Sequence, residues 1–180
     1  MVLAGYVRRL ARTVRLDAII DPAHAASDDP AVLAAHCLEA IDPTLSATIR
    51  EGDMLLVRDI TFPPSSSTAA DEPHTTTAVL ALQALGIAAV ICTTAPPHFI
   101  ALAASYGLPI IEQPASVAAI IDGSIVRIDL ERGTITTMNR ANRPAPWQFA
   151  PCPPEVCNAV RRAQLLARMR RIVENEGFAD

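Results

Sequence analysis

One stretch of this chain, residues 52–92, most constrains its fold. It begins with the apolar segment 54–57, continues through a polar loop into an amphipathic segment, and ends with the uninterrupted apolar run 87–92. Such a run is typical of a strand in a sheet that is covered on both faces. The order strand, loop, helix, strand therefore predicts a parallel β–α–β unit. The polar loop lies between a strand end and a helix start, where α/β proteins commonly bind anionic ligands.

The segments before this unit predict a first strand region and two helices. Residues 5–20 have the pattern of one or two short strands. Asp29 is a favourable N-cap, and Pro30 is favourable at the first position of a helix. Asp42 and Pro43 repeat this signal for a second, short helix that ends near residue 49. In the unit itself, we expect the helix over 77–85, with Gly86 as the residue that ends it.

The segments after this unit predict further α/β structure and then an antiparallel hairpin. We expect a helix from Pro97 to about Gly107, a strand over 108–111 and a helix over 114–121. Alternating apolar and polar residues over 126–138 predict a hairpin with one solvated face. A last helix is predicted over about 154–175. Its expected buried stripe is Val156, Val160, Ala163, Leu166 and Met169. We therefore predict a single mixed α/β domain over residues 1–180.

Charge and hydropathy exclude several classes of function. The net charge of −4 argues against a nucleic-acid surface. No apolar run reaches the roughly 20 residues that span a bilayer. The first sixteen residues carry four arginines and no acid, which fits either a transit peptide or a strand with a basic surface edge: Arg8, Arg9, Arg12 and Arg15. We favour the strand, because transit peptides are rich in serine and this segment has none.

The four cysteines predict neither a disulfide scaffold nor a metal centre. Cys37 and Cys92 lie on apolar faces and are expected to be core thiols. Cys152 and Cys157 have no further ligands at zinc spacing, and no set of cysteines suits an iron–sulfur cluster. We therefore expect a cytoplasmic protein with reduced thiols and no metal ligands of its own.

The chain resembles the small subunits of 3-isopropylmalate dehydratase, which belong to the aconitase superfamily. The likeness begins with the segment DAII at 17–20 and is closest over 29–57, DPAVLAAHCLEAIDPTLSATIREGDMLLV. Four further segments continue it in the same order, at 78–86, 86–91, 107–110 and 126–133. The resemblance covers residues 5 to about 173, and it implies the swivelling β/β/α domain of the aconitases.

The resemblance also implies a division of labour between two chains. In that family a separate large subunit carries a [4Fe–4S] cluster, and the small subunit closes over the active site. A loop of the small subunit, glycine–cysteine–glycine–serine–serine–arginine–glutamate–histidine, supplies a serine base and an arginine for a substrate carboxylate. Proton abstraction next to a carboxylate needs a positioned base, and the guanidinium fork of arginine suits a carboxylate. No cofactor is expected in this chain, and the expected partners are an aconitase-like large subunit and a small hydroxy acid.

This chain departs from the family in that loop, which is about seven residues longer. Counting forward from Phe62 places Ser66 and Ser67 on the serine pair and Thr68 on the arginine. Counting back from Ala78 instead places His74 on a serine and Thr75 on the arginine. Neither count gives an arginine, and the nearest in sequence is Arg58, at a strand end.

Two hypotheses remain open from the sequence. In the first, the chain is the small subunit of a hydro-lyase for 3-isopropylmalate or a related alkylmalate. Its predicted catalytic residues are Ser66, Ser67 and His74, and its predicted substrate-binding residues are Asp17, Thr68, Thr75 and Thr76. Asp17 matches a family position, and the histidine pKa suits a base at neutral pH. In the second hypothesis, the chain is a non-catalytic subunit that docks on a large subunit, because the loop arginine is missing.

Overall fold

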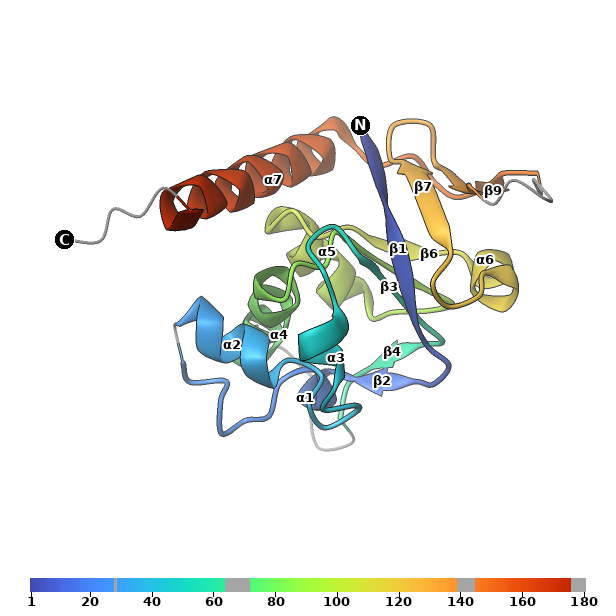
Figure 1. Cartoon of the computed structure of the whole chain (residues 1–180). Helices are drawn as coiled ribbons and strands as arrows, with labels where there is room; N and C mark the ends of the chain where they lie inside the picture. Colours follow the sequence, from blue (N-terminus) through green and yellow to red (C-terminus); the bar gives the residue numbers. More distant parts are fainter. Residues whose placement is uncertain (28, 64–71, 139–144, 176–180) are drawn as a thin grey trace.

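A computed structural model describes residues 1–27, 29–63, 72–138 and 145–175 of the chain, and its elements are labelled in Figure 1. The strands are β1 (Val2–Leu10), β2 (Val14–Arg15), β3 (Met54–Val57), β4 (Ile60–Thr61), β5 (Ala89–Cys92), β6 (Ile110–Glu112), β7 (Ile125–Asp129), β8 (Thr134–Thr137) and β9 (Trp147–Gln148). The helices are α1 (Leu16–Ile19), α2 (Pro30–His36), α3 (Leu45–Thr48), α4 (Glu72–Ala84), α5 (Pro97–Ser105), α6 (Pro114–Ala119) and α7 (Pro154–Asn175).

The main sheet is mixed, and β1 joins its two halves. Among the described residues it has seven strands in the order β6-β5-β3-β1-β7-β8-β9. The strands β6, β5, β3 and β1 run parallel, whereas β7, β8 and β9 continue from β1 in antiparallel pairs. A separate two-stranded parallel sheet pairs β2 with β4. The predicted parallel core and the predicted hairpin are both confirmed.

The central strands are buried because helices or the hairpin cover both faces of the sheet. All residues of β3 and β5 are buried. Leu55 and Val90 belong to one hydrophobic core, with residues of α4 and α5. Leu56 and Ile91 belong to a second core, with residues of α6, α7 and the hairpin. This division between two faces is the physical reason why the strand segments read as uninterrupted apolar runs.

Two helix termini follow the predicted capping chemistry, whereas α3 begins at Leu45, with Thr44 as its N-cap, and not at Pro43 as the sequence predicts. The Asp29 carboxylate accepts a hydrogen bond from the Ala31 amide at 2.9 Å, and Pro30 is the first residue of α2. Gly86 has a φ of 92° and follows the end of α4. Its amide donates to the Gln83 carbonyl, and the next amide, of Ile87, donates to the Leu82 carbonyl. These two bonds form a Schellman motif, which ends the helix as the sequence predicts.

The largest errors in the predicted element boundaries concern α1 and α4. Residues Leu16–Ile19 form the helix α1 and not part of a strand, because Leu16 and Ile19 fall on one buried helical face, and short apolar runs do not distinguish the two states. Helix α4 begins at Glu72, five residues earlier than predicted. Three consecutive threonines have low helix propensity, but packing of the helix on the sheet outweighs propensity.

The buried stripe predicted for α7 is wrong in its second half. Cys157 and Val160 are buried, whereas Leu166 and Met169 are 56% and 54% exposed. Figure 1 shows that the C-terminal half of α7 projects past the sheet. Apolar residues continue at helical spacing along all of α7, but the second half of the helix extends beyond the sheet on which the first half packs. None of the described helices combines the length and apolarity needed to cross a membrane.

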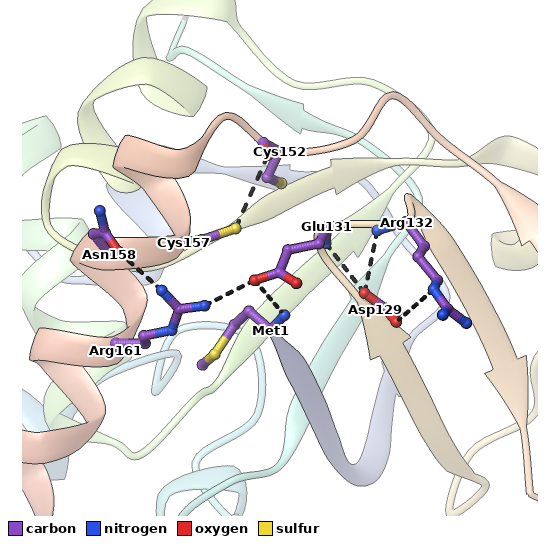
Figure 2. Close-up of polar contacts among 8 residues, drawn as sticks. All are labelled: Met1, Asp129, Glu131, Arg132, Cys152, Cys157, Asn158 and Arg161. Atoms are coloured by element: carbon purple, nitrogen blue, oxygen red, sulfur yellow. Dashed lines mark hydrogen bonds and ion pairs between the residues drawn. The ribbon is translucent and has the colours of Figure 1, made fainter.

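The first half of α7 is held against the start of β1 by a polar cluster (Figure 2). The Glu131 carboxylate, after β7, lies 2.7 Å from the Met1 amino group and 2.8 Å from an Arg161 guanidinium nitrogen. The amino terminus is the main cause of the lowered pKa of Glu131. Arg161 also donates to the Asn158 side chain at 2.9 Å. Arg161 therefore connects α7 to the hairpin.

The parallel pairing of β1 with β3 depends on a glycine. A Cβ atom at Gly5 would lie 1.9 Å from the Gly52 carbonyl oxygen, which belongs to the backbone and cannot move aside. We expect Gly5→Ala to lower the free energy of unfolding by about 3 kcal/mol, since overpacking against fixed atoms costs this much. Urea unfolding followed by circular dichroism measures the change. Ala4→Ser adds one atom to the exposed neighbouring residue and should change stability by under about 0.5 kcal/mol. Equal stability of Gly5→Ala and wild type would contradict this close packing.

Candidate functional site

The candidate site lies where α1 and α4 begin. Arg15 is the last residue of β2, Asp17 is in the first turn of α1, and His74 is the third residue of α4. Pairing of β2 with β4 aligns Arg15 with Thr61, just before the segment 64–71. Helix α4 begins directly after that segment. The fold therefore brings Arg15 and Asp17 to the two ends of the loop that the sequence analysis singled out.

Arg15 and Asp17 form a two-pronged ion pair. The Arg15 Nε donates to one carboxylate oxygen of Asp17 at 2.9 Å, and a terminal nitrogen of the same guanidinium contacts the other oxygen. This pairing is the main reason that the pKa of Asp17 lies below its usual value. Partial burial of the carboxyl acts in the opposite direction. The Asp17 side chain is 23% exposed and that of Arg15 is 53% exposed, so the guanidinium keeps donors on its solvent side.

His74 lies close enough to this pair to act on it electrostatically. The charge of a protonated His74 further lowers the pKa of Asp17. The Nε2 atom of His74 is buried and has no hydrogen-bond partner among the described residues. A buried polar atom without a partner costs about 1–3 kcal/mol, and such atoms cluster at functional sites. An imidazole nitrogen in this state, near a carboxylate, is a candidate for the general base that the sequence analysis predicted.

The other predicted site residues are placed as follows. Ser66, Ser67 and Thr68 lie outside the described residues. Thr75 is buried and Thr76 is half-buried. Both follow the first turn of α4, because that helix starts earlier than predicted. Asp17 and His74, predicted from different arguments, lie in one site, and their roles stay predictions.

Arg15 is the site residue that sequence reasoning missed. The sequence analysis grouped it with Arg8, Arg9 and Arg12 as part of a basic edge. Its separation from Asp17 by a single residue is the signal that could have identified the pair. Arg58, the arginine that the sequence analysis named, instead donates to the Thr13 hydroxyl at 3.2 Å and pairs with Asp59. Among the residues that the structure describes, Arg15 contacts a predicted site residue, Asp17, and Arg58 does not.

Comparisons with known proteins agree with this architecture. The 3-isopropylmalate dehydratase small subunit of Moorella thermoacetica is 30% identical to the chain over 174 residues, which are 97% of this chain and 98% of the relative. The 2,3-dimethylmalate dehydratase small subunit of Eubacterium barkeri is 35% identical over 140 residues, which are 78% of this chain and 81% of that protein. A scan against protein-family models found no match.

A solved structure shares the fold. The crystal structure of 3-isopropylmalate dehydratase from Methanocaldococcus jannaschii superposes with a TM-score of 0.70 at 27% identity, and the match covers 94% of this chain and 99% of that one. The sheet order and this likeness define the class, an α/β subunit of the aconitase type. The chain belongs to the family of 3-isopropylmalate dehydratase small subunits, which makes it a member of a family of hydro-lyase small subunits.

The ion pair predicts how Asp17 titrates. In Arg15→Gln, we expect the pKa of Asp17 to rise towards that of an ordinary aspartate, because the largest stabilising contact of the carboxylate is lost. Carboxyl chemical shifts in NMR measure this pKa directly. Because the pKa is lowered in the folded state, the pair stabilises the protein above the unfolded-state pKa, and this contribution is lost as pH falls through the folded-state pKa. The stability difference between Arg15→Gln and wild type should therefore disappear in acid.

Arg12→Gln is the matched control for this titration, because the charge of Arg12 acts on Asp42. This control should leave the pKa of Asp17 unchanged. An equal shift in both variants would mean that the general charge of the segment, and not the Arg15 contact, lowers the pKa.

Proposed function

We propose that this chain is the small subunit of a two-chain, iron–sulfur-dependent hydro-lyase. The proposed substrate is 3-isopropylmalate or a related alkylmalate, and the proposed partner is an aconitase-like large subunit. The observation that carries the proposal is the placement of Arg15, Asp17 and His74 near the residues that flank the segment 64–71. A cation and a proton acceptor are the two components that dehydration of a hydroxy acid requires of this subunit.

The proposed roles of these residues follow from their chemistry. The solvent-side donors of the Arg15 guanidinium bind a substrate carboxylate, while Asp17 holds the guanidinium in place. The His74 Nε2 atom takes the proton from the carbon next to that carboxylate. A double bond forms towards the neighbouring carbon as the hydroxyl group leaves. In this proposal Arg15, on β2, takes the place of the arginine in the family loop. Ser66 and Ser67 stay alternative candidates for the base.

The cysteines of this chain do not suit an iron–sulfur cluster, so we place the cluster on the partner. Cys37 and Cys92 belong to one core, whereas Cys152 and Cys157 belong to the core on the other face of the sheet. Four thiols on opposite faces cannot converge on one cluster. Burial also raises the pKa of both Cys37 and Cys92 to about 12, which disfavours the thiolate that iron binds. When bound, the cluster of the partner would supply the Lewis acid that assists departure of the hydroxyl group.

A non-catalytic docking subunit is the second candidate function. The absence of arginine from the segment 64–71 favours it, because the arginine of the family loop contributes to catalysis. The two proposals differ in whether the assembled complex needs side chains of this chain for turnover.

The deciding experiment is anaerobic reconstitution with the aconitase-like large subunit encoded in the same genome. Dehydration of 3-isopropylmalate and 2,3-dimethylmalate is followed by the absorbance of the conjugated acid. We expect turnover of at least one of the two acids. A tight complex that turns over neither acid, nor other alkylmalates, would favour the docking subunit.

Variants of the complex test the individual roles. We expect His74→Gln to lower kcat by at least about 100-fold, since loss of a general base costs 10²–10⁴-fold. Arg15→Gln should mainly raise KM, and Arg15→Lys should recover part of the loss. His98→Gln, which changes an exposed histidine at the start of α5, serves as the control and should leave both constants unchanged. Full activity in His74→Gln together with loss in Ser66→Ala or Ser67→Ala would assign the base to the loop.

A further inference from the structure

We propose that His24, His36 and Glu39 bind a divalent transition-metal ion. The three residues lie on the face of the sheet that carries α1 to α4, outside the group of Arg15, Asp17 and His74. His36 is the last residue of α2, Glu39 lies in the turn that follows, and His24 lies in the segment 21–27 between α1 and α2. The sequence predicted no metal ligands, because its cysteines lack partners at zinc spacing and no local pattern links His24 to His36 and Glu39.

The backbone around these residues is well fixed. Leu38 has a φ of 62°, a left-handed conformation that turns the chain back after α2. Its amide donates to the Ile19 carbonyl at 2.7 Å, which joins the turn to the end of α1. In the segment 21–27, the amides of His24 and Ala25 both donate to the Asp21 carbonyl. Hydrogen bonds therefore hold the two backbone segments that carry the three side chains.

The three side chains converge. The Nδ1 atom of His36 lies 2.6 Å from a carboxylate oxygen of Glu39. The ring of His24 stacks on that of His36, with centroids 3.6 Å apart and planes inclined by 4°. One ligand atom from each residue lies within 4.8 Å of the other two. Metal–ligand bonds of about 2.0–2.2 Å place neighbouring ligand atoms roughly 3 Å apart. Because the two rings are stacked with nearly parallel planes, their in-plane lone pairs do not point at one position, and the His24 ring has to turn out of the stack to complete the set.

The chemistry of the donors selects the kind of ion. Two imidazoles and one carboxylate suit Zn²⁺, Co²⁺ or Ni²⁺, whereas Mg²⁺ and Ca²⁺ prefer a shell of oxygen atoms. The side chains of His36 and Glu39 are 34% and 51% exposed, so an ion can enter from solvent and keep bound water.

An ion at this position would stabilise the framework of the candidate active site. It would join the segment 21–27 to the end of α2. The same segment contacts α4, because the Thr77 hydroxyl donates to the Ala25 carbonyl at 3.3 Å. Helix α4 carries His74, so the ion would fix the position of this helix without taking part in the reaction. This inference is independent of the proposed substrate and partner.

Metal titration of the full, untagged chain tests the proposal. We expect one equivalent of Co²⁺ to bind and give visible d–d absorption bands, and Zn²⁺ to displace it. Removal of an outer-shell partner of a metal ligand costs 10–100-fold in affinity, so loss of a ligand should lower the affinity by at least about tenfold. The variants for this test are His24→Gln, His36→Gln and Glu39→Gln. Glu39→Gln is the least disruptive of the three, because the side chain is exposed and the replacement has the same shape.

Two controls and a second readout complete the experiment. His98→Gln and the double variant Cys152→Ser, Cys157→Ser should bind Co²⁺ like wild type. Zn²⁺ should raise the unfolding temperature of wild type and of these controls, but not of the three ligand variants. The proposal is wrong if wild type binds no stoichiometric ion. Retention of wild-type affinity in all three ligand variants, or its loss in either control, would also overturn it.

Discussion

The close approach of three backbone segments around the turn 50–53 fixes the rest of the structure. The Gly52 carbonyl lies directly beside Gly5 of β1, and the Gly52 amide donates to the carbonyl of Gly86, which precedes β5. The buried carboxylate of Asp53 accepts from the Arg8 guanidinium at 2.9 Å and from the Arg50 amide at 3.0 Å. These contacts set the relative positions of β1, β3 and β5 at one end of the sheet.

The pairing of β1 with β3 also determines where the chain runs at the other end of these strands. Because β1 and β3 are parallel and in register, the segments that follow them leave the sheet side by side and pair again as β2 and β4. This second pairing brings Arg15 beside Thr61 and places Asp17 near the start of α4. The candidate site is therefore a product of strand register, although none of its side chains belongs to the main sheet.

Under the proposed function, Arg15 supplies a cation at the site although the loop differs from that of the family. Arg15 on β2 is held by Asp17, a residue of the segment that resembles the family. A guanidinium on a paired strand is more firmly positioned than one on a long loop, since backbone hydrogen bonds fix the strand. The proposed ion at His24, His36 and Glu39 would likewise restrict the backbone near the candidate site. It would fix the segment between α1 and α2 against α4.

The sequence by itself determined the elements whose signals are local. The strands β3 and β5, the caps at Asp29 and Gly86 and the antiparallel hairpin follow from apolar runs, capping residues and alternation. Sequence reasoning also named Asp17 and His74 as candidates, the first by resemblance and the second by its count along the loop and the pKa range of histidine, and their roles stay predictions. It misjudged α1, the start of α4 and the second half of α7, because packing outweighs propensity and a periodic apolar stripe does not reveal where the domain beneath it ends.

Only the tertiary structure decided which of these residues meet. Asp17 and His74 are far apart in the chain, and the packing of α1 against α4 brings them close enough for the charge of His74 to act on Asp17. The same holds for His24 and Glu39, which meet because Leu38 turns the chain back after α2. The physical reason is that a local sequence pattern encodes backbone preference and burial, whereas a site requires side chains from separate segments to converge, and that convergence depends on the register and packing of the whole sheet.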